Sequence, residues 1–223
     1  MNRTKILRRI IDLCMIVVLP LLMAYELIGR STHEWLGVTM LALVIVHQII
    51  NRAWYQSLFK GRYSALRIVT VMMDLALILL MILQAISGMS MARHLPDAVP
   101  ALLRRSVARM IHMTCAYWCF TLMCMHAGFH MSPMIARLRR RMKPFAFAAL
   151  GMLVCLIAAY GVYAFIRRQL PAYMFMQIKF AFFDYEEPLA FFFADYIAIM
   201  MLFLLAGHGL ASLLKRVKKE HKK

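Results

Sequence analysis

Long apolar runs alternate with short polar segments along the whole chain, and this pattern predicts membrane-spanning helices. A helix needs about 20 mostly apolar residues to cross the hydrocarbon core of a bilayer. Six runs reach roughly that length: residues 10–29, 34–52, 66–90, 107–131, 144–166 and 188–214. We therefore expect an all-α integral membrane bundle of six transmembrane helices, in which residues 1–223 form a single membrane domain.

The composition supports a membrane environment. Of the 223 residues, 63% are hydrophobic and 17% are charged, whereas an ordinary soluble domain is about 45–50% apolar and about 25% charged. The excess of apolar side chains requires a solvent other than water, and the lipid bilayer supplies it. These proportions exclude most classes of soluble protein.

Lysine and arginine give the chain a net charge of +17 and gather at every second boundary between apolar runs. Four clusters result, within residues 3–9, 52–67, 137–143 and 215–223. Cytoplasmic loops of membrane proteins carry such an excess of positive charge. We therefore expect a multi-pass protein with all four clusters and both termini on the cytoplasmic side, next to membrane lipid. In a soluble protein this charge would suggest nucleic acid, but its position at span ends argues against that partner.

The longest predicted outer connection, residues 167–187, is rich in aromatic side chains and ends in acidic ones. Aromatic residues at this level commonly form the belt at the membrane interface. A docking surface for an extracytoplasmic partner is the alternative interpretation.

Four of the eight histidines form two pairs with the same spacing. His33 and His47 are 14 residues apart in the second predicted span, and His112 and His126 are 14 residues apart in the fourth. Fourteen residues make nearly four helical turns and rise about 21 Å, so each helix presents one histidine near each membrane face. The second and fourth spans run in the same direction, which predicts that His33 is level with His112 and His47 with His126.

Two imidazoles that face each other at one depth are the ligands that a six-coordinate haem iron takes inside a helical bundle. The sequence thus predicts two stacked haem b sites between the parallel second and fourth spans. The outer ligands would be His33 and His112, and the inner ligands His47 and His126. Covalent attachment of the c type is excluded because the chain has no C-x-x-C-H motif.

Small residues and arginines accompany the outer ligands. Gly37 and Ala116 each lie four residues after an outer histidine, where a flat macrocycle would approach the helix and a bulky side chain would collide with it. Arg30, Arg105 and Arg109 lie at the outer face against the positive-inside trend. Guanidinium groups pair well with carboxylates, so these arginines are candidates to hold haem propionates; ordinary surface arginines are the alternative.

Other histidines leave alternatives open. His130 shares a helix face with His126 and could ligate the inner iron in its place. His94 lies in an outer loop and is either solvent-exposed or close to a quinone. His208 lies between two glycines, which permit close helix contact, and is a weaker candidate for a third site. A packing role for all these histidines is the remaining alternative, but it does not explain the equal spacing.

Four acids lie within or at the ends of the predicted spans: Asp12, Glu26, Asp74 and Asp195. Buried carboxylates are costly in a membrane and often carry protons or pair with a cation. Asp74 could reach Arg67 only across two helical turns, so a protonated Asp74 is the alternative. Glu26 is a candidate acceptor for a quinol proton.

Several segments resemble one known family. The segments H-E-W-L-G at 33–37 and H-Q-I-I-N-R at 47–52 resemble the H-E-W-x-G and H-x-x-x-N-[RW] segments of the flavinylation-associated cytochromes, small bacterial membrane proteins with two b haems. Similar further elements are the Ser87-Gly88 step, His112 with Tyr117-Trp118, H-A-G-F-H at 126–130 and F-F-D-Y at 182–185. The resemblance extends over almost the whole chain.

The resemblance implies a transmembrane b-type cytochrome of the bacterial cytoplasmic (inner) membrane. Such a protein relays electrons from quinol or a cytoplasmic donor to a periplasmic acceptor, often a flavoprotein with covalently bound FMN. We expect that flavoprotein to be a separate partner. The chain would be an electron-transfer component, and an oxidoreductase in its own right only if it oxidises quinol itself. The alternatives are a ferric or ascorbate-type transmembrane reductase that acts directly on a small substrate, and a haem-free membrane scaffold subunit.

Overall fold

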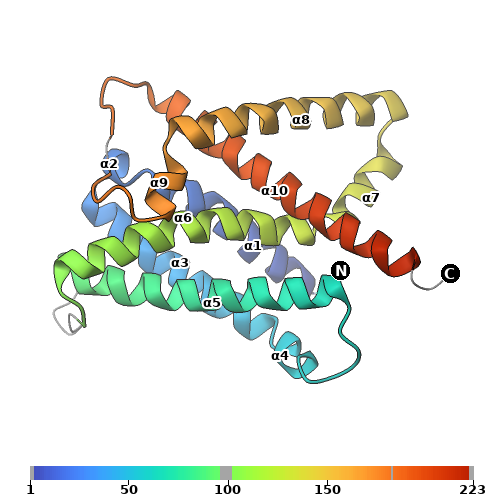
Figure 1. The fold of residues 1–223 in the computed structure, drawn as a ribbon, viewed down its shortest axis with the longest axis horizontal. Helices are drawn as coiled ribbons and strands as arrows, with labels where there is room; N and C mark the ends of the chain where they lie inside the picture. The colour runs from blue at the N-terminus through green and yellow to red at the C-terminus, as the bar shows by residue number, and fades with distance from the viewer. Residues whose placement is uncertain (1–2, 96–101, 182, 221–223) are drawn as a thin grey trace. The chain divides into compact units, whose positions relative to one another are not determined.

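The secondary structure is helical throughout the part of the chain that the computed structural model describes, residues 3–95, 102–181 and 183–220 (Figure 1). The long helices are α1 (Arg3–Met23), α3 (Arg30–Ile50), α5 (Ala65–Met91), α6 (Arg105–Phe129), α8 (Pro144–Arg167) and α10 (Leu189–Glu220). The short helices are α2 (Tyr25–Ile28), α4 (Ala53–Ser57), α7 (Ser132–Arg141) and α9 (Leu170–Met174). The all-α prediction is confirmed.

Four of the described helices are long and apolar enough to cross a membrane: α3, α5, α8 and the Leu189–Arg216 part of α10. Helices α1 and α6, which hold the first and fourth predicted spans, have 21 and 25 residues but are not among the four. Charged residues at the start of α1, and arginine and histidine in α6, reduce the apolar character of these helices. The structure thus supports a membrane protein, and six spans remain a prediction.

The first predicted span, residues 10–29, is divided in two. Helix α1 contains Pro20 and ends at Met23. A proline inside a helix removes one backbone hydrogen bond and its ring crowds the preceding turn, and the break follows within one turn. Gly29 then separates α2 from α3 with φ +76°, a conformation that glycine adopts without the strain of a Cβ.

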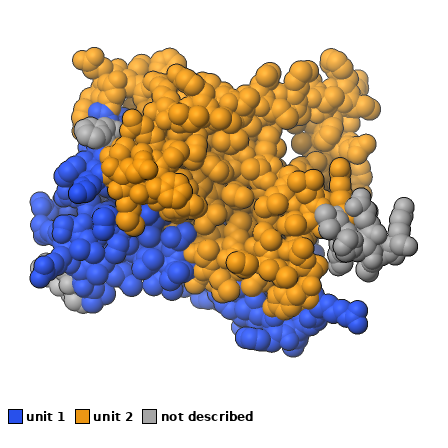
Figure 2. All heavy atoms as spheres, viewed as in Figure 1, with its two compact units in different colours: residues 1–62, 79–116, 179–183 blue, residues 63–78, 117–178, 184–223 orange. Residues whose placement is uncertain are grey.

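The chain forms two compact units, which are coloured separately in Figure 2. Unit 1 comprises residues 1–62, 79–116 and 179–183, and unit 2 comprises residues 63–78, 117–178 and 184–223. Helices α5 and α6 each contribute one part to each unit.

In unit 1, α1 packs against α3 in antiparallel orientation. The Arg8 guanidinium donates to the carbonyl of Ile50 over 2.9 Å, and Asp12 lies 3.0 Å from His47. At the other end of the pair, the ring of Tyr25, just beyond α1, lies 5.1 Å from that of His33. Residues early in α1 therefore lie beside residues late in α3.

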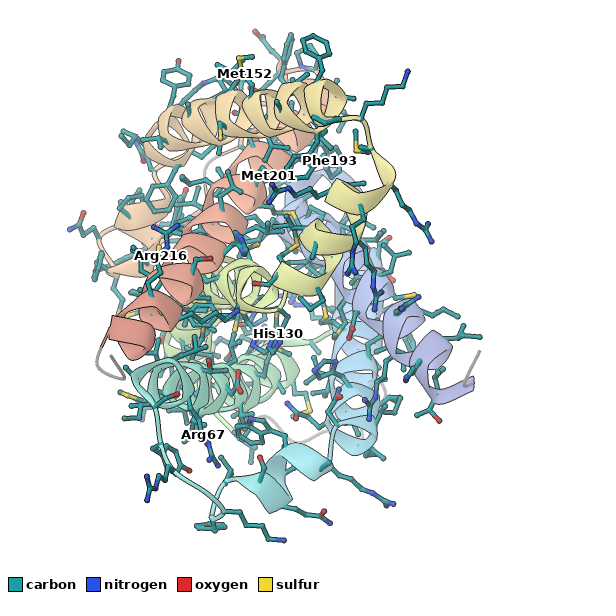
Figure 3. The ribbon with its side chains drawn as sticks, turned by 90° about the vertical axis from the view of Figure 1, so that its right-hand side faces the viewer. Arg67, His130, Met152, Phe193, Met201 and Arg216 are labelled. Atoms are coloured by element: carbon teal, nitrogen blue, oxygen red, sulfur yellow. The ribbon has the colours of Figure 1, made fainter. Side chains whose placement is uncertain are left out.

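In unit 2, α10 lies beside α8, and small residues allow their close approach (Figure 1). Gly161 of α8 is buried directly against the backbone of Ala198, where a Cβ would collide with the Ala198 carbonyl group. Met152 on α8 is largely exposed and points away from α10 (Figure 3). Small residues at such contacts are typical of helix packing in membranes.

Candidate functional site

The rings of His33 on α3 and His112 on α6 lie next to each other in unit 1. Their centroids are 6.0 Å apart and their planes are inclined by 71°. Two metal–imidazole bonds of about 2 Å each, on opposite sides of one ion, separate the two ring centres by about 6 Å. The structure therefore brings the predicted outer pair to the spacing of two ligands on one metal ion.

The imidazole of His112 is oriented by two residues of α5 that the sequence reasoning did not select as site residues. Gln84 Nε2 lies 3.1 Å from His112 Nε2, and Ser87 Oγ lies 3.3 Å from Nδ1. The Ser87 hydroxyl donates its proton to a carbonyl of its own helix, so its oxygen accepts from His112 Nδ1–H. The Nε2 lone pair of His112 then accepts from the Gln84 amide.

Glycine residues lie close to this pair of histidines, at positions where a side chain would interfere with the rings or with a group bound beside them. A Cβ at Gly88 would lie 3.2 Å from His112 Cε1, so the absence of a side chain there leaves the ring its position. Around Gly37 nothing lies within 4 Å of a Cβ position, and Ala116 is half-buried. The open space at Gly37 fits the predicted approach of a flat group, and Gly88, which the sequence indicated only as part of the Ser87-Gly88 step of the family resemblance, makes room for His112.

Arg30, a candidate for a propionate partner, has partners within the protein. Its guanidinium donates to Glu34 over 2.9 Å and to the carbonyl of Met91 over 2.6 Å. Glu34 also accepts from the backbone N–H groups of Arg93 and His94, at 3.1 and 2.8 Å. Arg30 and Glu34 therefore hold the end of α5 against the start of α3, and His94 is half-exposed at this junction.

Arg105 and Arg109, the other two candidates, are exposed near the start of α6. The Arg109 guanidinium lies 5.4 Å from the centroid of the Phe180 ring, a cation–π distance. Arg105 and Arg109 are thus the arginines that remain predicted to meet a carboxylate of a ligand.

His47, the predicted inner ligand on α3, faces α1 in unit 1. Its Nδ1 lies 3.0 Å from Asp12 Oδ1. An imidazole whose Nδ1 is hydrogen-bonded keeps Nε2 for a metal. Neither the run of apolar residues nor the spacing of histidines had indicated this pair.

His126, the predicted inner ligand on α6, belongs to unit 2 and so is described apart from His47. Its Nδ1 lies 2.9 Å from Asp74 Oδ1 on α5, where the carboxylate is 13% exposed. Asp74 is therefore paired with a histidine, and Arg67 instead stacks on the ring of Tyr63 at 4.2 Å. His130, the alternative ligand, is exposed at the end of α6, and its ring lies 4.9 Å from that of His126 (Figure 3).

His208, the candidate for a third site, lies on α10 beside a close contact with α6. A Cβ at Gly207 would collide with the carbonyl of Met125, and a Cβ at Gly128 with the carbonyl of Leu204. The Nδ1 atom of His208 is buried and has no hydrogen-bond partner among the residues described. The helices thus approach closely at this histidine, in agreement with the small residues beside it.

Asp195, the fourth acid of the predicted spans, belongs to an ion-pair network in unit 2. It is fully buried and accepts from Arg168 over 2.7 Å and from the Tyr160 hydroxyl over 2.5 Å. Glu187 completes the network with contacts to Arg167 at 3.0 Å and to Arg168 at 2.6 Å. Burial lowers the pKa of Arg168, but hydrogen bonds to Glu187 and Asp195 outweigh it and the pKa is raised. The role of Asp195 is to hold residues 184–195 against the end of α8.

We expect Tyr160→Phe to lower the free energy of unfolding by about 1.5 kcal/mol, because a hydrogen bond to a charged group is lost. Tyr163→Phe is the matched control, since that ring is 58% exposed on the same helix and its change should have no measurable effect. Reversible unfolding in detergent micelles measures both. Equal stabilities of the two variants would contradict the role assigned to this network.

Helix α9, which lies within the predicted outer segment 167–187, is held by aromatic contacts. The Trp118 indole donates to the carbonyl of Met174 over 2.9 Å, and Tyr117 stacks on Tyr173 with centroids 4.6 Å apart. Phe182, part of the F-F-D-Y motif, lies outside the described residues. These contacts hold α9 in place, which fits either an interfacial belt or a docking surface.

No group of three or more His, Cys, Asp or Glu side chains that could hold a bare metal ion occurs in the described ranges. Haem iron needs no such group, because the macrocycle supplies the ligands other than the axial ones. Comparison with protein-family models, curated proteins and solved structures finds no match to this chain. The resemblance to the flavinylation-associated cytochromes therefore stays a prediction from the motifs.

Proposed function

We propose that the chain is a membrane-embedded b-type cytochrome that relays single electrons across a membrane. The observation that carries the proposal is the pair of imidazoles on α3 and α6, His33 and His112, whose centroids are 6.0 Å apart. Helix packing alone gives no reason for the histidines of two helices to repeat the same spacing of 14 residues. Four long apolar helices support the membrane setting.

The residues around the pair fit a haem. Two neutral imidazole nitrogens are a common axial ligand set for b-type haem iron, and a macrocycle between helices requires small residues beside it. Gly37 supplies such a position on α3, where nothing lies within 4 Å of a Cβ, and the half-buried Ala116 supplies one on α6. Haem, when bound, supplies one-electron redox chemistry.

The chain's own residues fix the ligands. The Ser87 oxygen holds the Nδ1–H of His112 and thereby sets its tautomer, and Gly88 leaves room for the ring. Surrounding apolar side chains exclude water, and burial together with hydrogen bonds to the ligands tunes the potential.

The proposal includes a second haem, which rests on the equal spacing of His47 and His126 in the sequence. Each of these imidazoles has a carboxylate at its Nδ1. Quinol or a cytoplasmic reductase would be the donor, and a periplasmic flavoprotein the acceptor. The motif resemblance supports that acceptor, and a bacterial cytoplasmic membrane as the location.

The ratio of haem to protein tests the proposal. We expect purified protein from haem-replete cells to show the α band of a b-type cytochrome in a dithionite-reduced minus oxidised spectrum. A pyridine haemochrome assay should give two b haems per chain. One haem per chain would restrict the proposal to the His33–His112 pair, and negligible haem would favour a haem-free scaffold.

A further inference from the structure

Two of the four proposed ligands carry the same kind of partner on a neighbouring helix. Nδ1 of His47 forms a hydrogen bond of 3.0 Å with Asp12, and Nδ1 of His126 lies 2.9 Å from Asp74 in an ion-pair contact that is not aligned as a hydrogen bond. One pair lies within unit 1 and the other within unit 2, so the two contacts are independent observations. In both contacts the carboxylate lies at Nδ1 of the imidazole, so Nε2 is not the nitrogen that meets the carboxylate.

His112 differs from these two histidines. Its ring nitrogens meet the hydroxyl of Ser87 and the amide of Gln84, both neutral. The carboxylate partner is thus found at the two histidines predicted for the inner level, and His112 at the outer level lacks it. An ionised carboxylate such as that of Asp74, 13% exposed on a helix apolar enough to cross a membrane, is expensive unless it has a partner or a task.

We propose that Asp12 and Asp74 are positioning residues for haem ligation, which act through the imidazoles of His47 and His126. The inference rests on the proposed function. A carboxylate at Nδ1 holds that nitrogen in its protonated form, orients the ring and makes Nε2 a stronger donor. A stronger donor stabilises ferric iron over ferrous iron, so each haem ligated in this way has a lower midpoint potential than the same haem would have without the carboxylate.

Variants in which asparagine replaces Asp12 or Asp74 distinguish an effect of the carboxylate charge on the haem ligand from an effect of side-chain packing. Asp12→Asn and Asp74→Asn keep the size of the side chain and an oxygen that accepts a hydrogen bond, but remove the charge. We expect both variants to retain haem and to shift one midpoint potential to a more positive value. Asp12→Glu and Asp74→Glu restore the charge and should return the potential toward the wild-type value. Asp184→Asn is the matched control, because it removes one charge at an exposed position in the outer segment, and should leave both potentials unchanged.

The measurement is a spectroelectrochemical titration of each purified variant at one pH. Ferric electron paramagnetic resonance of the wild type adds a readout that requires no variant to fold: the two haems should give two different g anisotropies, because only one of them is ligated by imidazoles that contact carboxylates. Wild-type protein without haem would overturn the proposed function. Haem-loaded protein in which both asparagine variants keep wild-type potentials, or in which two haems share one g anisotropy, would overturn this inference alone.

Discussion

Replacing His112 by alanine is expected to remove one b haem completely, so that the haem content per chain falls by half while the protein remains folded. The imidazole of His112 is the partner that lies 6.0 Å from His33 and is oriented by Ser87 and Gln84. Alanine offers no ligand, and a haem iron held only by His33 loses one of its two axial bonds. The pyridine haemochrome assay measures the loss, and size-exclusion chromatography in detergent reports the fold.

His94→Ala is the control for this prediction. His94 lies near the same end of α3, but its side chain is 46% exposed and contacts Glu34, not the imidazole pair. It should keep the wild-type haem content. His33→Ala should behave like His112→Ala. Full haem content in His112→Ala would show that the two rings meet without ligating iron. A large loss of haem in His94→Ala would indicate that the ligand is His94 in the outer loop.

The helices could be predicted from the sequence because hydrophobic length and helix-ending residues are local signals. The predicted fifth span, 144–166, matches α8 at Pro144–Arg167, since proline favours the first position of a helix. The first predicted span, 10–29, differs from the structure for a local reason: α1 contains Pro20 and ends at Met23, so the apolar run is not one continuous helix.

The candidate site could be predicted only in part. The spacing of 14 residues pointed to His33 and His112, because the helical period converts sequence distance into depth. The partners of the histidines could not be found in this way. Asp12 meets His47 only through the antiparallel register of α1 and α3, and Gln84 meets His112 only through the packing of α5 on α6. Side-chain packing between helices sets such a register. A local sequence pattern does not predict that packing.

The Gly-His-Gly segment at residues 207–209 of α10 is another place where the helix contact could not be predicted from the sequence. It also gives a second prediction with a large expected effect. Both glycines were predicted to permit close helix contact. Residues two apart in a helix point about 200° apart, so only one of them can face α6. In the structure Gly207 faces the backbone of Met125, whereas nothing lies within 4 Å of a Cβ at Gly209.

We therefore expect opposite effects from the same change at neighbouring glycines. Gly207→Ala should lower the free energy of unfolding by about 3 kcal/mol or more, because its Cβ would meet the Met125 carbonyl group and backbone atoms can move only if the helices separate. Gly209→Ala should raise it by up to about 1 kcal/mol, because alanine is the better helix former and the position is open. Unfolding in detergent micelles compares the two. Gly128→Ala tests the contact from the α6 side and should match Gly207→Ala. Equal effects at Gly207 and Gly209 would mean that α10 turns a different face to α6, and His208 with it.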